Sequence, residues 1–152
     1  MNNAVHFLQT VCELDDKIII SDAVRPCITL REIAAVYDAL NLFVAVTSGV
    51  EVYETLLKME DGQIKTIIPR NGIVRQTAPE GYRFSTLKSL YIDIEPHIVS
   101  GYSNIGIDYL FSNGVQIGFV KSNPLNIKIT TPDDLIVFET ILEKGFNELL
   151  LS

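Results

Sequence analysis

Short runs of apolar residues alternate with helix-forming segments along this chain, and this alternation most constrains its fold. Residues 17–21, "KIIIS", and residues 42–47, "LFVAVT", are apolar at successive positions rather than at every second one. Strands of that kind are typical of a parallel sheet that is covered on both faces. A third such run, "VQIGFV", occupies residues 115–120. The chain is therefore predicted to fold as α/β, in layers of helices packed on a sheet.

Capping residues mark where two of the predicted helices begin. One helix begins after Thr29, an N-cap residue, and Glu32 stands three residues on, where it completes a capping box. The last helix begins after Thr131, and Pro132 takes its first position, where a helix needs no N–H donor. Two aspartates follow and suit the positive end of the helix dipole. Two further helices are predicted over residues 2–14 and 104–112.

Residues 50–70 depart from this pattern and are predicted to form a long β-hairpin. Two β-rich runs, "VYETLLKM" and "QIKTIIP", are joined by "EDG", which is a hairpin turn signal. The hairpin carries several isoleucines, among them Ile67 and Ile68, so it exposes apolar surface unless something covers it. The same hairpin of a second chain is the simplest cover, and this arm therefore predicts a homodimer.

Composition narrows the functions open to the chain. Its 152 residues fit a single domain, 1–152, and 47% of them are hydrophobic. A net charge of −7 without clustered lysine and arginine argues against nucleic acid or an anionic membrane as a partner. No apolar run is long enough to span a membrane, so we expect a soluble, cytoplasmic protein. Cys12 and Cys27 lack the spacing of a zinc site or of a disulfide framework.

The stretch "SDAVRP" places an acid and a base directly after a predicted buried strand. Asp22 and Arg25 stand three residues apart just past "KIIIS". Ligands of open parallel sheets bind outside the carboxyl ends of the strands, so both side chains are expected to face that crevice. Aspartate suits Mg²⁺, and arginine suits phosphate oxygens. On spacing alone a simpler interpretation is favoured, in which Asp22 caps a turn and Arg25 pairs with a surface acid.

Other cations of this acidic chain stand beside predicted turns and strand ends. Arg70, Arg75 and Arg83 crowd around a tight turn predicted within residues 69–84, and Lys128 precedes the last helix. A lysine at the end of an apolar strand needs an anionic partner. This placement favours an anionic small-molecule ligand.

Five motifs follow one another in the order found in one enzyme family. They are "DAVRP", "YETLLK", "PRNG", "APEGYR" and "NIKITTPDDL", within a match from about residue 3 to residue 145. Each is weak alone, but five in register are specific. The chain resembles the cytidylyltransferases that join CTP to a polyol phosphate, either 2-C-methyl-D-erythritol 4-phosphate or ribitol 5-phosphate, and release pyrophosphate. The resemblance implies a Rossmann-like nucleotidyltransferase sheet with a protruding β-hairpin arm that swaps between the subunits of a homodimer.

The resemblance also implies roles for five residues. Asp22 would lie near Mg²⁺ and the triphosphate of CTP, Arg25 would orient phosphate or substrate groups, and Lys128 would contact the substrate phosphate. Thr55 and Arg70 would reach across the dimer to the polyol phosphate in the neighbouring subunit. The reaction implied is attack by an oxygen of the polyol phosphate on the α-phosphorus of CTP. It depends on positioning and charge neutralisation more than on a base.

The chain also departs from the family pattern. Members open with a strand and a Gly-rich loop of the type LxAAGxGxRM, followed by a lysine, whereas residues 1–13 here already match the helix before "DAVRP". We therefore expect a partial sheet, in a chain that is truncated or completed by another chain, with "KIIIS" or "LFVAVT" left as an apolar edge. Ala78 replaces a threonine of the methylerythritol enzymes, and "NIGI" at 104–107 replaces "TDDA" or "TDEA". Both changes tilt the expected acceptor toward ribitol or a capsule sugar.

Three functions remain open on these grounds. A cytidylyltransferase whose catalytic half is present here predicts chemistry that depends on CTP once the amino-terminal part is restored. A non-catalytic remnant that still dimerises through its arm predicts a dimer that binds no nucleotide. A module that only holds a polyol phosphate predicts binding that depends on Thr55 and Arg70 but not on Mg²⁺.

Overall fold

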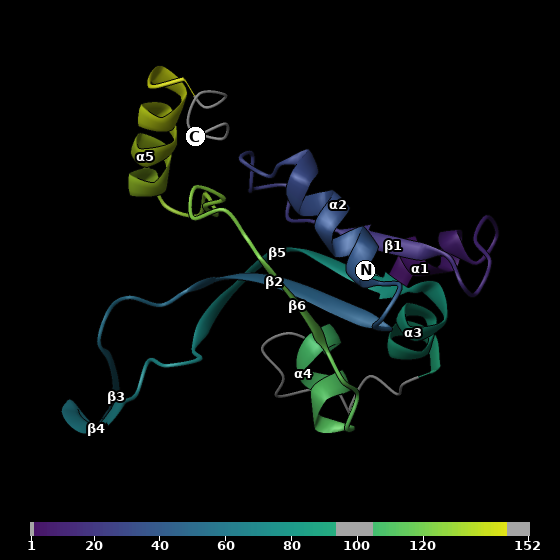
Figure 1. Ribbon diagram of the computed structural model, residues 1–152, viewed down its shortest axis with the longest axis horizontal. Helices are drawn as coiled ribbons and strands as arrows, with labels where there is room; N and C mark the ends of the chain where they lie inside the picture. The colour runs from purple at the N-terminus through teal and green to yellow at the C-terminus, as the bar shows by residue number, and fades with distance from the viewer. Residues whose placement is uncertain (1, 94–104, 146–152) are drawn as a thin grey trace.

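The computed structural model describes residues 2–93 and 105–145, in which helices and strands alternate along the chain (Figure 1). Residue 104 of the predicted helix 104–112, and the end of the last predicted helix after residue 145, lie outside the described residues. The elements are α1 Asn2–Leu8, β1 Lys17–Ile20, α2 Leu30–Ala39, β2 Ala45–Glu51, β3 Leu56–Glu60, β4 Gln63–Ile68, β5 Val74–Arg83, α3 Phe84–Lys88, the π-helix η1 Ser89–Asp93, α4 Ile105–Ser112, β6 Gly118–Lys121 and α5 Pro132–Glu143.

Four strands form the main sheet, in the order β1-β5-β2-β6. Strand β6 runs parallel to β2, and β5 runs antiparallel to both β1 and β2. The α/β prediction is confirmed, but the sheet is mixed rather than purely parallel. Strand β1 is an edge of the described sheet, whereas β2 lies inside it, so "KIIIS" is the run that is left at an edge.

Strand β5 corrects the prediction of a tight turn across residues 69–84. The turn is confined to the start of that segment, where the Ile73 N–H donates to the Arg70 oxygen at 3.0 Å. The strand follows at once and spreads Arg75 and Arg83 to its two ends rather than crowding them. A proline normally excludes a central strand, and Pro79 is accommodated because the pairing of β5 with β2 is irregular beside it.

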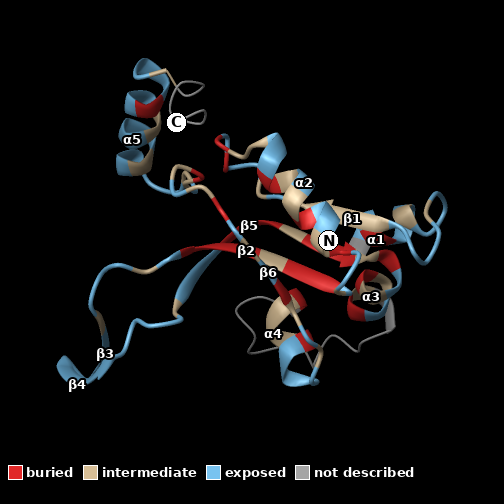
Figure 2. Cartoon of the chain, in the orientation of Figure 1, coloured by how far each residue is buried: buried red, intermediate tan, exposed pale blue. Residues whose placement is uncertain are grey.

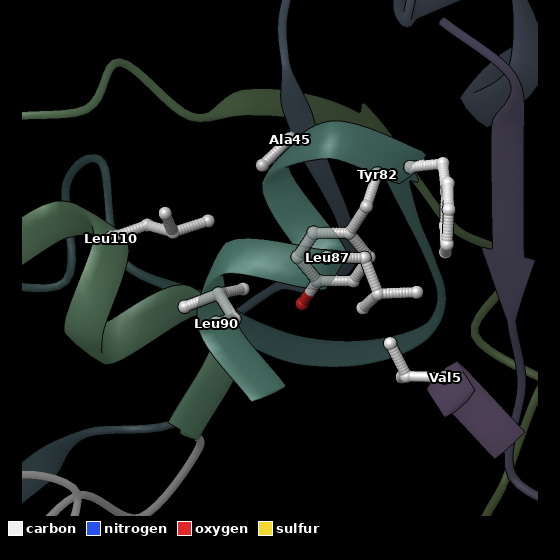
Figure 3. Close-up of a cluster of buried hydrophobic side chains, with 7 residues drawn as sticks. Val5, Ala45, Tyr82, Leu87, Leu90 and Leu110 are labelled. Carbon is white, nitrogen blue, oxygen red and sulfur yellow. The ribbon is translucent and has the colours of Figure 1, made fainter. Parts of the chain in front are cut away.

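Helices cover both faces of this sheet, α2 on one face and α3 and α4 on the other (Figure 1). Neighbouring residues of β2 point to opposite faces: Val46 packs with Val36 of α2, and Ala45 packs with Leu110 of α4. Figure 3 shows the larger of the two clusters, in which Tyr82 lies beside Leu87. Burying a large apolar side chain contributes about 1.5–3 kcal/mol, so this layer anchors the sheet. Its buried members are Val5, Ala45, Tyr82, Phe84, Leu87, Leu90 and Leu110.

The predicted capping box of α2 is present, and the predicted cap Thr131 of α5 belongs to a second box that was not predicted. The Thr29 hydroxyl accepts from the Glu32 N–H at 3.1 Å, and the Glu32 carboxylate accepts from the Thr29 N–H at 3.0 Å. In α5, Thr131 and Asp134 make the same reciprocal pair. The first helix is shorter than predicted and ends at Leu8 instead of continuing to residue 14. Just past that end, the Thr10 hydroxyl donates to the Phe7 oxygen at 2.7 Å, a local bond that competes with helix continuation.

Strands β3 and β4 form the predicted hairpin, which stands apart from the main sheet as a two-stranded arm (Figure 1). Asp61 and Gly62 have φ angles of +49° and +74°, the left-handed conformation that a tight hairpin turn requires. Figure 2 shows the arm almost wholly exposed. Helix α5 also stands away from the sheet (Figure 1). Within residues 2–93 and 105–145, no helix combines the length and the apolar character needed to cross a membrane.

Candidate active site

A pocket of about 340 Å³ lies at the carboxyl end of β1. Two larger cavities lie elsewhere, one at the base of the arm and one between α4 and β6. The pocket beside β1 is the one in which three of the predicted site residues meet. Its walls are Ile20, Ser21, Asp22, Arg25, Gln76, Thr77, Ala78, Glu80, Tyr91 and Lys128.

Asp22 holds two cations at this pocket through one of its oxygens. Its Oδ2 atom accepts from Nε of Arg25 at 3.0 Å and lies 3.5 Å from Nζ of Lys128. Neither bond from these cations engages Oδ1, which accepts no hydrogen bond from any residue that the structure describes. One carboxylate thus gathers two positive side chains and keeps one oxygen available.

Backbone bonds bring these three residues together. The backbone N–H of Arg25 donates to the backbone oxygen of Asp22 at 3.1 Å, which closes a turn directly after β1. The Ile129 N–H donates to the Val24 oxygen at 2.9 Å, which fixes the segment before α5 against that turn. The turn expected by the simpler interpretation therefore exists. Arg25 does not point to the surface, however, because it is only 8% exposed.

Strand β5 forms the floor of the pocket and was missed by the sequence reasoning. Gln76 donates to Glu80 at 2.6 Å and to the Thr47 hydroxyl at 3.0 Å. Tyr82 donates to the other oxygen of Glu80 at 2.6 Å. Pro79 argues against a strand at this position, so β5 was not predicted. The apolar run "KIIIS" needs a partner strand, and that need was the signal that could have pointed to "EGYR". Glu80 adds a second carboxylate to the walls of the pocket.

The phenols near Glu80 are held in their protonated form. Burial raises the pKa of Tyr82, and the neighbouring Glu80 carboxylate raises it further. Burial and the same carboxylate also raise the pKa of Tyr91. Both groups are therefore hydrogen-bond donors at neutral pH rather than bases.

Thr55 and Arg70 lie outside this pocket, on the two sides of the base of the arm. Thr55 is exposed and comes directly before β3, and Arg70 is exposed and follows β4. The Arg70 guanidinium donates to the backbone oxygen of Tyr53, which ties the two sides of the arm together. The structure thus brings Asp22, Arg25 and Lys128 together and leaves Thr55 and Arg70 on a separate part of the same chain.

The pocket suits a metal ion that is shared with a bound ligand. Across the described part of the chain, no cluster of three or more His, Cys, Asp or Glu side chains is arranged to hold a metal ion. Among the residues that line the pocket, all of them described by the structure, Asp22 is the one with a carboxylate oxygen that accepts no hydrogen bond. Mg²⁺ is commonly held by one or two carboxylates together with substrate phosphates, and Asp22 fits that kind of coordination.

Comparisons with known proteins agree on one family. A family model described as 2-C-methyl-D-erythritol 4-phosphate cytidylyltransferase matches residues 2–144. The enzyme of that name from Ruthia magnifica subsp. Calyptogena magnifica is 32% identical over 139 residues, which are 89% of this chain and 56% of that protein. The one from Caldicellulosiruptor bescii is 27% identical over 131 residues, 86% of this chain and 57% of that protein. The chain spans about half the length of the curated relatives it matches.

A solved structure establishes the likeness of the fold. The crystal structure of 2-C-methyl-D-erythritol 4-phosphate cytidylyltransferase from Francisella tularensis superposes with a TM-score of 0.79 at 24% identity. The superposition covers 91% of this chain and 64% of that one. The sheet, arm and helices described above are therefore those of a nucleotidyltransferase fold.

Proposed function

Because this chain belongs to the 2-C-methyl-D-erythritol 4-phosphate cytidylyltransferase family, we propose that it transfers CMP from CTP to 2-C-methyl-D-erythritol 4-phosphate with release of pyrophosphate. The observation that carries the proposal is the convergence of Asp22, Arg25 and Lys128 on one pocket. Two cations face one carboxylate on the Asp22 side of the pocket, while the other carboxylate, Glu80, is already bonded by Gln76 and Tyr82, so the Asp22 side favours an anionic ligand. The relatives are named for the methylerythritol acceptor, so we place it ahead of ribitol 5-phosphate.

The residues at the pocket suit phosphoryl transfer without a strong base. An oxygen of the polyol phosphate forms a bond to the α-phosphorus of CTP, and the bond from that phosphorus to the pyrophosphate oxygen breaks. Pyrophosphate leaves with the electron pair. Arg25 and Lys128 bind phosphate oxygens and offset their charge, while Asp22 holds both cations in place. Positioning and electrostatics therefore supply the catalysis.

Asp22 would also hold Mg²⁺ through its available oxygen, together with phosphate oxygens of the nucleotide. When bound, the ion neutralises charge that builds on the phosphates. The protein's own part is to present one carboxylate beside two cations, so that nucleotide and metal enter the same pocket.

The arm adds a second part of the proposal, in which the protein acts as a homodimer. The exposed apolar side chains of β3 and β4 have no cover within the described chain, and a lone two-stranded hairpin is at best marginally stable. A second copy supplies a matching apolar arm. In that assembly, Thr55 and Arg70 reach the polyol phosphate in the neighbouring subunit, which accounts for their distance from the pocket of their own chain.

Pyrophosphate release is the experiment that tests the function. The protein is incubated with CTP and Mg²⁺, and with 2-C-methyl-D-erythritol 4-phosphate, ribitol 5-phosphate or no acceptor. We expect release with the first acceptor and its loss in Lys128→Met, while Lys144→Met, on the exposed end of α5, keeps it. Release with ribitol 5-phosphate alone would replace the acceptor.

Calorimetry with each ligand separates the remaining functions when no pyrophosphate is released. Binding of a polyol phosphate without turnover would identify a binding module. A folded dimer that binds neither CTP nor a polyol phosphate would identify a non-catalytic remnant. Either result would overturn the proposed transferase activity.

A further inference from the structure

A buried carboxylate connects helix α2 to the segment that carries Lys128. Glu32 is 5% exposed, and its Oε2 atom serves the capping box of α2. Its Oε1 atom has a different task and reaches the segment after β6. There it accepts from the Ser122 hydroxyl, from the Asn123 N–H at 2.9 Å and from Nδ2 of Asn126 at 3.3 Å. A capping box needs only one of these two oxygens, so the second is not explained by the helix.

Asn126 passes this connection on to the pocket. It is 1% exposed, and its Nδ2 atom also donates to the Ala78 backbone oxygen at 2.6 Å. Its own backbone oxygen accepts from Nη1 of Arg25 at 2.8 Å. Asn126 is therefore fixed against α2 and β5 at once while it holds the arginine of the candidate site.

Stability alone is a poor explanation for an asparagine at this position. Its Oδ1 atom is buried and accepts no hydrogen bond from any described residue. A buried acceptor without a partner destabilises the fold, and such groups in folded proteins call for an explanation. The amide is explained instead by what its Nδ2 atom and backbone oxygen hold.

Arg25 needs a second tether to present its donors to a ligand. A guanidinium has five N–H donors, and within the described chain those of Arg25 contact only Asp22 and Asn126. Asp22 is a loose tether, because it is 39% exposed and shares the same oxygen with Lys128. The buried Asn126 oxygen is the firmer of the two. It sets the plane of the guanidinium, and with it the direction of the remaining N–H groups.

We propose that Glu32 is a positioning residue for Arg25: it holds Asn126, and Asn126 orients the guanidinium that binds phosphate. The proposal rests on the proposed function for the identity of the ligand, a phosphate group of CTP or of the polyol phosphate. The orientation of Arg25 itself is a property of the free protein, so it is measurable without any ligand.

Nuclear magnetic resonance of the arginine side chains gives the first test. The Nε–H signal of Arg25 is identified by its loss in Arg25→Lys. We expect this signal to be shifted or broadened in Glu32→Gln. The NH₂ group of glutamine cannot accept from the donors of Ser122, Asn123 and Asn126, so Asn126 is held less firmly against Arg25. Asp134→Asn is the matched control, since Asp134 completes the capping box of α5 without contacting Asn126 or Arg25. An unchanged Arg25 signal in Glu32→Gln would overturn the proposal.

A double-mutant cycle on CTP affinity gives the second test. We expect Glu32→Gln to weaken binding about tenfold, which is typical for loss of a hydrogen bond to a charged group. The same change in an Arg25→Lys background should have little further effect, since Glu32 acts through Arg25. If Glu32→Gln weakened CTP binding by the same factor with Arg25 and in the Arg25→Lys background, the role of Glu32 would be merely structural. If Glu32→Gln does not fold, Asn126→Ala replaces it in both tests. Asn126→Ala removes the side-chain amide that bonds to Glu32 and keeps the backbone oxygen that bonds to Arg25.

The two proposals fail in different ways. A wild-type protein that binds neither CTP nor the polyol phosphate would contradict the proposed function, and the resonance of Arg25 would still decide the role of Glu32. A protein that binds CTP with an Arg25 signal indifferent to Glu32 would contradict the positioning role alone.

Discussion

Nζ of Lys128 lies 3.5 Å from Oδ2 of Asp22, the same oxygen that accepts from Nε of Arg25 at 3.0 Å. A single carboxylate oxygen therefore faces two cations whose positions in the sequence are far apart. A phosphate that enters the pocket competes with Asp22 for these cations, whereas a metal ion needs Asp22 itself. The carboxylate thus has opposite effects on the two kinds of ligand.

Asp22→Asn tests this opposition. Without Mg²⁺, the variant is expected to bind the polyol phosphate as tightly as the wild type or more tightly, because Arg25 and Lys128 no longer face a competing anion. With Mg²⁺, CTP binding and pyrophosphate release are expected to fall. Calorimetry with and without the metal measures both effects. Asp38→Asn, at an exposed acid of α2, removes the same charge elsewhere and should change neither effect. If Asp22→Asn bound its ligands more weakly both with and without Mg²⁺, the opposite effects assigned to Asp22 would be contradicted.

Arg70→Ala tests the part of the arm that follows β4. If Arg70 contacts the acceptor phosphate across the dimer, its loss should weaken polyol-phosphate affinity at least about tenfold, as expected for a charge-assisted hydrogen bond. Arg31→Ala removes an exposed cation from α2 and serves as the control. Titration calorimetry measures both variants, and equal affinities would take Arg70 out of the site.

Ile67→Asp tests the arm as a dimer contact. Ile67 is 66% exposed on β4, and a buried aspartate in an apolar interface without a partner is strongly unfavourable. The variant is expected to run as a monomer in light scattering and sedimentation. Leu42→Asp, at an exposed leucine away from the arm, should remain a dimer. A dimer that survives in Ile67→Asp would place the interface elsewhere.

Gly81→Ala tests how closely α2 packs on β5. A methyl group at Gly81 would lie 2.6 Å from Cγ1 of Val36 and 3.0 Å from Cδ1 of Leu40, closer than atoms in a folded core tolerate. We expect a loss of roughly 1–3 kcal/mol in the free energy of unfolding. Shortening the neighbour by Val36→Ala should recover part of this loss. Additive losses in the double variant, measured by denaturant unfolding, would mean that the contact is not the cause.

Asp134 makes the stability of α5 depend on acid pH. Hydrogen bonds from Thr130 and Thr131 lower the pKa of this carboxyl from 3.8 to about 2. A lowered pKa means that the charged form stabilises the helix above the ordinary pKa, and that this contribution is lost as the pH falls toward about 2. At neutral pH, the backbone amides of α5 should therefore be better protected against hydrogen exchange in the wild type than in Asp134→Asn. This difference in protection should vanish in acid. A difference that is independent of pH would contradict this account.

Local signals predicted the parts of the fold that depend on few residues. Thr29 with Glu32, and Thr131 with Pro132, mark true helix starts because caps act within one turn. The turn at Asp61 and Gly62 marks a true hairpin for the same reason.

Elements decided by distant contacts were harder to predict. Strand β5 contains Pro79 and reads as a turn, and only its pairing with β1 and β2 makes it a central strand. The end of helix α1 at Leu8 was missed for a different reason, because a local bond from the Thr10 hydroxyl to the Phe7 oxygen competes with the helix there.

The candidate site was predictable where it follows a strand end. Asp22 and Arg25 come directly after β1, and general rules for α/β sheets place them at a crevice. Lys128 joined them through its motif and not through any periodicity. The roles of Glu32 and Asn126 could not be read from the sequence, because Glu32 already had a sufficient explanation as a capping residue.

Strand β5 gives the arm a mechanical connection to the pocket. The strand begins just after the turn that closes the arm, and its Gln76 and Thr77 line the pocket floor. Residues 74–77 pair with β2 alone, and only the end of the strand, from Glu80 to Arg83, also pairs with β1, so a displacement of the arm enters the sheet along a paired strand. In the proposed dimer, a load applied to the arm would therefore be borne by the same peptide units that line the pocket.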